Sequence, residues 1–233
     1  MSTFSGGAPI WARFVNSSNR TEQREAPRGW TIPLGTERLP PPEGAEADCP
    51  LPFDWERRSY AALDVETTGL EPYSDRVLEI GIVLFSFDSE GALVEERTWQ
   101  SLLNPGISIP ASATAIHGIT DFDVFASPFF RELAAELANL LEGRVMVAHN
   151  APFDSGFIAR EFSRLGMASP VGEMADSLIL LRRAVPNLLS YSLGKAAFIL
   201  GVDTGSSHRA LDDARTCMHL FTLSMRKLAG ACP

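Results

Sequence analysis

The sequence predicts an α/β domain, in which helices pack on a mixed sheet, preceded by an irregular N-terminal arm. From about residue 57 onward, strand-like segments come first, and helical segments later alternate with a further strand. Residues 1–55 instead are rich in Pro, Gly, Ser and charge, and show no sustained helical or strand period. We therefore expect an arm at residues 1–55 and a folded domain at residues 56–233.

The first part of the domain is expected to form a meander of three strands. The opening strand begins with the apolar run from Tyr60 to Leu63, and residues 76–87 are β-branched and apolar. A short turn that contains Gly91 joins them to residues 93–103, which is typical of an antiparallel hairpin. Residues 144–149, RVMVAH, are expected to add a short buried strand later.

The first long helix is expected between the hairpin and this later strand. Residues 127–143 have apolar residues at helical spacing, with Ser127 as the cap, Pro128 at the first position and Gly143 as the stop. The stretch before it, residues 104–120, is loop-like and leaves room for short helical turns.

Further helices are expected from residue 152 to the end of the chain. The segment from Pro152 to Leu165 is predicted to be one, and Asp176 and Ser190 are the expected N-caps of two more. The final helix should start near Arg209. Its apolar face would carry Ala210, Ala214, Cys217, Phe221 and Leu228.

Composition excludes several classes of protein. No apolar run approaches the roughly 18 residues that span a membrane, and the N-terminus lacks the regions of a signal peptide. The three cysteines stand in no metal-binding spacing, so a reducing, cytoplasmic setting is expected. The net charge of −9 argues against a broad basic surface for nucleic acid. The net charge does not argue against a nuclease, because divalent cations bound to acidic residues make a site locally positive.

Two acids interrupt the opening strand. Asp64 and Glu66 are two residues apart, so on a strand their side chains point to the same face. Such close carboxylates repel each other unless a cation lies between them, and a divalent metal ion is the usual one. The alternative is that both acids lie on a solvated edge strand.

Two later stretches supply further acids. Asp154, in the first turn of the helix that follows the fourth strand, is either a third ligand or a helix-capping acid. His208 and Asp213 would lie about 140° apart on one helix, so they cannot share a face. If His208 lies on the loop before the helix, it can reach the site that Asp213 faces. The alternatives are an exposed His and a helix-terminal acid, the role that we assign to Asp212.

The stretches LDVETTGL, HNAPFD and HRALDDA resemble, in order and spacing, the three motifs of the DEDDh (DnaQ-like) 3′–5′ exonucleases. This family includes proofreading subunits of bacterial DNA polymerase III. The resemblance covers about residues 57–228, and Arg209 stands where the sister subgroup has a Tyr. It implies a ribonuclease H-like fold, which is a mixed five-stranded sheet flanked by helices.

The resemblance also implies roles for particular residues. Two Mg²⁺ or Mn²⁺ ions, about 3.5–4 Å apart, would clamp the scissile phosphate, and His208 would take the proton from the attacking water. Asp64 would bridge the two ions. The metal ligands would be Asp64, Glu66, Asp154 and Asp213. The pocket for the 3′-terminal nucleotide would be lined by Thr67, Gly69, Leu70, His117, Asn150 and Phe153. For His117, a turn-capping role competes with substrate binding.

The expected activity is 3′–5′ exonucleolytic hydrolysis to nucleoside 5′-monophosphates, with a proofreading- or repair-like role. A single-stranded or frayed DNA 3′ end is the favoured substrate, with RNA trimming as the alternative. An inactive nuclease fold that serves as a binding subunit is a third possibility, which the presence of all the acids disfavours.

The N-terminal arm contains Trp11, Trp30 and Trp55, although disordered segments are usually poor in aromatic residues. These rings are expected either to pack on the domain or to dock a protein partner. The chain lacks the C-terminal tail of polymerase-bound subunits, so we expect a stand-alone or differently tethered exonuclease.

Overall fold

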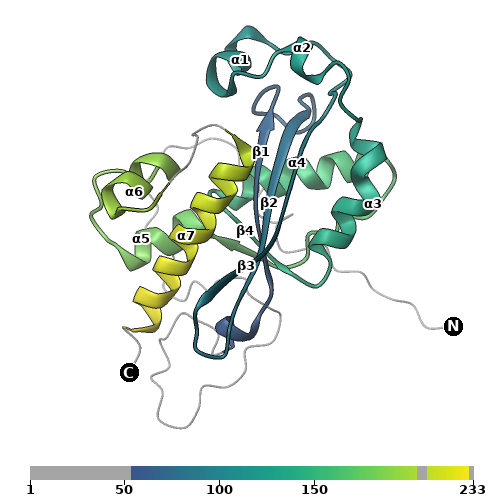
Figure 1. The fold of residues 1–233 in the computed structure, drawn as a ribbon. Coiled ribbons are helices and arrows are strands. Elements are labelled where there is room, and N and C mark those ends of the chain that lie inside the picture. The colour runs from purple at the N-terminus through teal and green to yellow at the C-terminus, as the bar shows by residue number, and fades with distance from the viewer. Residues whose placement is uncertain (1–53, 204–208, 231–233) are drawn as a thin grey trace, which may run out of the picture. The chain divides into compact units, whose positions relative to one another are not determined.

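A five-stranded mixed sheet forms the centre of the domain in the computed structural model, which describes residues 54–203 and 209–230 (Figure 1). The strand order is β3-β2-β1-β4-β5. Strands β1, β2 and β3 are antiparallel neighbours, whereas β4 and β5 run parallel to β1. The strands are β1 (Tyr60–Thr67), β2 (Val77–Phe87), β3 (Leu93–Leu102), β4 (Val145–Ala148) and β5 (Met174–Asp176).

The predicted meander of β1, β2 and β3 is confirmed, as is the short strand β4. Strand β5 has only three residues, too few to show a period, so residue patterns did not predict it. The fifth strand had been expected only from the resemblance to the DEDDh exonucleases.

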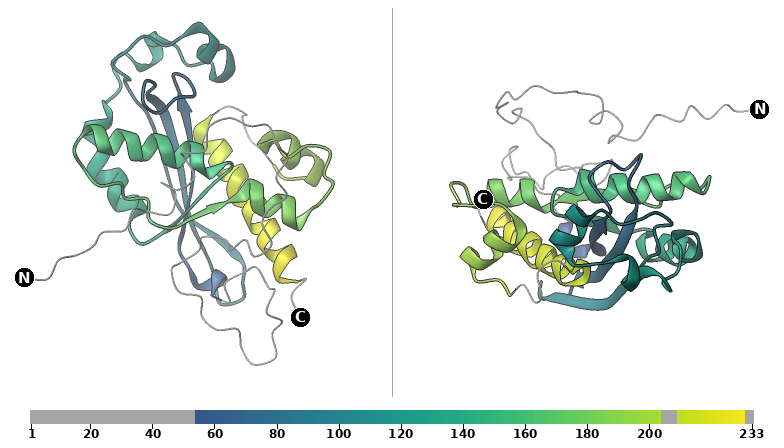
Figure 2. Two further views of the ribbon diagram at one scale, coloured as in Figure 1. Left: turned by 180° about the vertical axis from the view of Figure 1, so that it is seen from behind. Right: turned by 90° about the horizontal axis from the view of Figure 1, so that it is seen from above.

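Helices cover both faces of the sheet (Figures 1 and 2). Helices α3 and α4 pack on one face, and α5 and α7 pack on the other. The helices are α1 (Ala111–His117), α2 (Asp121–Val124), α3 (Phe130–Leu141), α4 (Ala151–Arg164), α5 (Ser177–Ala184), α6 (Leu193–Leu200) and α7 (Ala210–Ala229), after a short 3₁₀ helix, η2 (Trp55–Arg57).

Two expected helix starts were wrong. Helix α3 begins at Phe130, and not at Pro128, because the Pro128 carbonyl accepts a hydrogen bond from Asn104 N–H of the preceding loop. The Glu132 carboxylate instead accepts the Phe129 N–H at the start of the helix. Helix α6 begins two residues later than expected, with Ser192 as its N-cap in place of Ser190. Asp176 caps α5 as predicted.

Strand β1 divides its side chains between two apolar cores. Ala61, Leu63 and Val65 belong to the core beneath α3 and α4. Tyr60 and Ala62 belong to the core beneath α7, where they lie opposite Phe85 and Val83 of β2. Alternation along the strand therefore directs the next two side chains of this second row, those of Asp64 and Glu66, toward the α7 face.

A glycine sets how closely α7 approaches the sheet. Gly81 of β2 lies directly opposite Asp64, and a Cβ atom at this position would overlap the backbone of Ala210 and Leu211. The first turn of α7 thus rests on the sheet where β2 has no side chain. This contact brings the start of α7 next to the acidic end of β1.

Trp55, which we counted with the arm, is buried in the core beneath α7, with its ring 4.9 Å from that of Phe87. Trp11 and Trp30 lie outside the described residues, and the boundary at residue 55 stays a prediction. Within the described ranges, no helix combines the length and the apolar character needed to cross a membrane.

Gly81→Ala should destabilise the domain because the added methyl group overlaps the α7 backbone. We expect a loss of at least about 2 kcal/mol in the free energy of unfolding, measured in urea. Gly194→Ala is the matched control, since this exposed helical glycine has nothing within 4 Å of an added Cβ. It should change stability by less than about 1 kcal/mol, in the stabilising direction. Equal effects of the two substitutions would contradict the close packing of α7.

Candidate active site

Three carboxylates from two elements meet at the end of β1. Asp64 and Glu66 project from the strand, and Asp213 projects from the first turn of α7. Each offers one oxygen, and these oxygens all lie within 4.8 Å of one another. All three side chains are half-buried, so a ligand can reach them. An all-oxygen donor set of this kind suits a hard divalent cation such as Mg²⁺ or Mn²⁺.

Asp154 approaches the same place from the other side of β1. It lies in the first turn of α4 and is only 3% exposed. Strand β4 pairs with β1 only as far as Ala62, so the backbone beyond that point lacks a strand partner on this side. The Asp154 carboxylate fills the gap and accepts the Val65 N–H at 3.1 Å. Val65 stands between the two acids of β1, so Asp154 is positioned beside the carboxylate cluster.

Burial, together with the proximity of the other acids, shifts the pKa values of these carboxyls. Burial, followed by the charges of Asp154, Asp213 and Glu66, raises the pKa of Asp64 well above its ordinary value. Burial and then the charge of Asp213 raise the pKa of Glu66 to about 7. Burial also raises the pKa of Asp154 to about 8, although the hydrogen bond from Val65 acts in the opposite direction. Without a cation, the folded protein therefore favours protonated forms of these acids.

A fifth acid, Glu79, supports the site and was missed in the sequence. It lies opposite Glu66 in the β1–β2 pairing and is fully buried. Its carboxylate forms an ion pair with Arg209 at 2.9 Å and accepts hydrogen bonds from Gln100 Nε2 and Ala210 N–H. The acid within the apolar run LEIGIV was the only signal in the sequence. Glu79 thus fixes the start of α7, the helix that carries Asp213.

Polar contacts also fix the turn from β4 into α4. Asn150 has a left-handed backbone, with φ of 73°, and its N–H donates to Asp176 at 3.2 Å. The preceding His149 ring contacts the Ser177 hydroxyl at 2.9 Å and the Tyr191 carbonyl at 2.7 Å. This turn holds the first residues of α4, including the predicted substrate residue Phe153, at the carboxyl end of the parallel strands.

The remaining predicted substrate residues occupy two segments. Thr67, Gly69 and Leu70 are in or beside the loop after β1, where the Thr67 hydroxyl donates to the Gly69 carbonyl at 2.6 Å. His117 is buried at the end of α1, and its Nδ1 accepts the Ile119 N–H at 3.0 Å. That bond favours the turn-capping interpretation of His117. His208 lies outside the described residues, so its predicted loop position is untested.

Comparisons with known proteins find similar chains over most of the domain. An exonuclease family model, RNase_T, matches residues 61–221, which include all four acids. The chain is 35% identical over 177 residues to DNA polymerase III subunit epsilon of Treponema pallidum, covering 73% of this chain and 80% of that protein. It is 32% identical over 169 residues to 3′-5′ exonuclease DinG of Staphylococcus haemolyticus, covering 72% of this chain but only 18% of that protein. The solved structure of exonuclease X in complex with 5′ overhanging duplex DNA has a TM-score of 0.56 and 25% identity, covering 72% of this chain and 91% of that chain.

The metal-free domain should lose stability as the pH rises from about 5 to 8. The folded pKa values of Glu66 and Asp154 lie above those of free carboxyls, so in this window the folded state binds more protons than the unfolded state. Thermal unfolding in EDTA, followed across this range, measures the slope. Adding Mn²⁺ at pH 8 should raise the midpoint again.

Asp64→Asn is the informative variant for this experiment because it removes one charge from the centre of the cluster. In this variant the midpoint of thermal unfolding should depend less on pH, and Mn²⁺ should raise the midpoint by less than in the parent. A parent protein whose stability rises with pH in EDTA would contradict the raised pKa values.

Proposed function

The chain belongs to the exonuclease family, and on this premise we propose that it removes nucleotides one at a time from the 3′ end of nucleic acid. The products would be nucleoside 5′-monophosphates. The observation that carries the proposal is the meeting of Asp64, Glu66 and Asp213, whose oxygens lie within 4.8 Å of one another. Such a cluster, beside a further acid, suits metal-assisted hydrolysis of a phosphodiester.

Two divalent cations, Mg²⁺ or Mn²⁺, are the proposed cofactors. Asp64, Glu66 and Asp213 would hold one ion, while Asp64 and Asp154 would support the other. When bound, these ions polarise the scissile phosphate, activate water and stabilise the leaving 3′-oxygen. The raised pKa values of the acids support this assignment, because a bound cation would offset the repulsion that disfavours their ionised forms.

The residues around the acids provide positioning and proton transfer. His208 is the proposed base, because histidine side chains in general can exchange a proton near neutral pH. It directly precedes Arg209 in the sequence, and Arg209 forms an ion pair with the buried Glu79. Thr67, Gly69, Leu70, Asn150 and Phe153 remain the proposed contacts of the 3′-terminal nucleotide.

DNA is the proposed substrate, in a proofreading- or repair-like role. Two named relatives support this: a DNA polymerase III subunit, and exonuclease X in complex with 5′ overhanging duplex DNA. A single-stranded or frayed 3′ end would enter the site. We propose a cytoplasmic location and keep the arm at residues 1–55 as a candidate docking segment for a protein partner.

Asp213→Asn should lower the rate of hydrolysis at least about a hundredfold, because a metal-assisted step depends on several kcal/mol of charge stabilisation. Asp212→Asn is the matched control from the same helical turn, and it should keep near-parental activity. The assay uses 5′-labelled single-stranded DNA, single-stranded RNA and mismatched duplex DNA, each with Mg²⁺ and with Mn²⁺.

The pattern of cleavage decides between the possible functions. Shortening from the 3′ end that is fastest on DNA supports the proposal. Faster cleavage of RNA would favour the RNA-trimming alternative. An Asp213→Asn protein as active as the parent would refute the catalytic assignment, and no hydrolysis of any substrate would favour an inactive binding subunit.

A further inference from the structure

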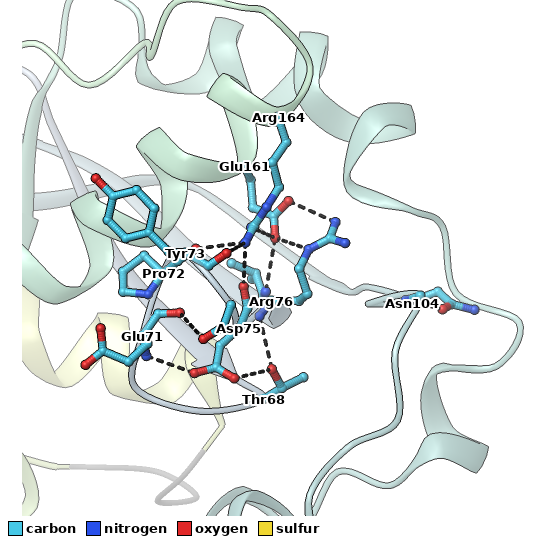
Figure 3. A network of polar contacts seen from close by, with 12 residues as sticks. Thr68, Glu71, Pro72, Tyr73, Asp75, Arg76, Asn104, Glu161 and Arg164 are labelled. Carbon is cyan, nitrogen blue, oxygen red and sulfur yellow. Dashed lines mark hydrogen bonds and ion pairs between the residues drawn. The ribbon is translucent and has the colours of Figure 1, made fainter.

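The loop of residues 68–76, between β1 and β2, is held rigidly against α4 (Figure 3). One amino group of Arg164, Nη2, donates to three loop carbonyls: those of Pro72 at 2.8 Å, Tyr73 at 3.1 Å and Asp75 at 2.9 Å. The other, Nη1, forms an ion pair with Glu161 at 3.0 Å. Because these contacts combine an ion pair with several backbone bonds, they fix both the position and the shape of the loop.

Glu161 links the far end of the loop to the same helix. It is only 2% exposed, and its two oxygens accept bonds from Arg76 Nε at 2.8 Å and Nη2 at 3.0 Å. Inside the loop, the Asp75 carboxylate accepts the Glu71 N–H at 2.9 Å. A Cβ atom at Gly69 would overlap this carboxylate, so a larger residue there would displace the Asp75 side chain. The loop is therefore preorganised before any ligand binds.

This rigid loop presents a large aromatic ring to solvent. Tyr73 is 72% exposed, and its hydroxyl points away from the Arg164 network (Figure 3). The guanidinium of Arg160 lies over the Tyr73 ring, 4.8 Å from the centroid. Among the described residues, Arg160 forms no ion pair, in contrast to its neighbours Arg76 and Arg164. The pair thus combines an exposed ring with a cation that no carboxylate of residues 54–203 or 209–230 neutralises.

The two elements that carry this pair both begin beside the carboxylate cluster. The loop begins directly after β1, the strand that carries Asp64 and Glu66. It rests on α4, where Pro72 would be 3.7 Å from a Cβ at Gly156, two residues after Asp154. Asp154 and Arg160 are six residues apart on this helix, which corresponds to about 9 Å along its axis. That separation is of the order of one or two nucleotides of an extended strand.

We propose that Tyr73 and Arg160 form a second nucleotide subsite, which binds the strand on the 5′ side of the 3′-terminal nucleotide. A base would stack on the exposed face of Tyr73, and Arg160 would contact a backbone phosphate. Stacking accepts every base, so the subsite would add affinity without sequence preference. With a net charge of −9, the chain has little general attraction for a polyanion. A local contact of this kind would therefore contribute a large share of the affinity for the nucleic-acid strand.

The inference rests on the proposed exonuclease function, and substrates of different length test it. The p-nitrophenyl ester of thymidine 5′-monophosphate fills only the terminal site, whereas a single-stranded octanucleotide would also cover the second subsite. Tyr73→Ala should raise KM for the octanucleotide about tenfold and leave KM for the ester within about twofold. Arg160→Gln should raise the octanucleotide KM several-fold and reduce its salt dependence.

Two variants serve as controls. Tyr73→Phe keeps the ring and should retain the parental KM. Phe198→Ala removes an aromatic side chain that is 85% exposed on α6, away from the loop, and should leave the octanucleotide KM unchanged. Urea unfolding should show that Tyr73→Phe and Phe198→Ala keep the parental stability within about 0.5 kcal/mol, the range expected of surface substitutions. Tyr73→Ala and Arg160→Gln, which lose the contact between ring and guanidinium, should stay within about 1 kcal/mol of the parent.

The subsite would be refuted if Tyr73→Ala bound and cleaved the octanucleotide like Phe198→Ala, or if its KM rose equally for both substrates. Anisotropy of a fluorescent octanucleotide with Ca²⁺, which replaces the catalytic metal, measures the same contact without hydrolysis. A parent protein that hydrolyses neither substrate would refute the proposed function, while a tenfold loss of binding in Tyr73→Ala would still support the subsite.

Discussion

Repulsion among the clustered carboxylates is the constraint on which the rest of this domain depends. Burial and mutual charge raise the pKa values of Asp64, Glu66 and Asp154, so the fold holds these groups where they are electrostatically unfavourable. Such an arrangement persists only when the surrounding packing supplies the stability. The same repulsion is what a divalent cation would relieve, which couples metal binding to the stability of the folded state.

The packing that supplies this stability is concentrated at the start of α7 and the end of β1. Gly81 lets the backbone of Ala210 rest on the sheet, and Glu79 binds Arg209 and the Ala210 N–H. On the opposite side, β1 extends beyond its pairing with β4, and Asp154 accepts the Val65 N–H, which has no strand partner there. Asp154 and the helix that carries Asp213 are thus positioned by contacts that also stabilise the fold.

The loop after β1 is likewise fixed in position by contacts with the rest of the fold. The bonds of Arg164 to three carbonyls define the position of a segment that would otherwise be a mobile connection between two strands. A rigid loop loses little conformational entropy when a strand of nucleic acid binds. The domain can therefore present both its acids and its proposed second subsite in a fixed relation, without a broad basic surface.

Much of the fold and part of the candidate site could be predicted from the sequence alone. Strand alternation predicted that Asp64 and Glu66 share a face. The loop position predicted for His208 lies outside the described residues and stays a prediction. Strands β1 to β4 and helices α3, α4 and α7 followed from local sequence patterns. Local patterns did not predict β5, which is too short to show a period, or the true start of α3, where Asn104 binds the Pro128 carbonyl. Only the tertiary structure decided that Asp154 binds Val65, that Glu79 anchors Arg209, and that Arg160 lies over Tyr73. The physical reason is that these contacts join residues up to 130 positions apart, and a local pattern contains no information about which distant partner the fold brings near.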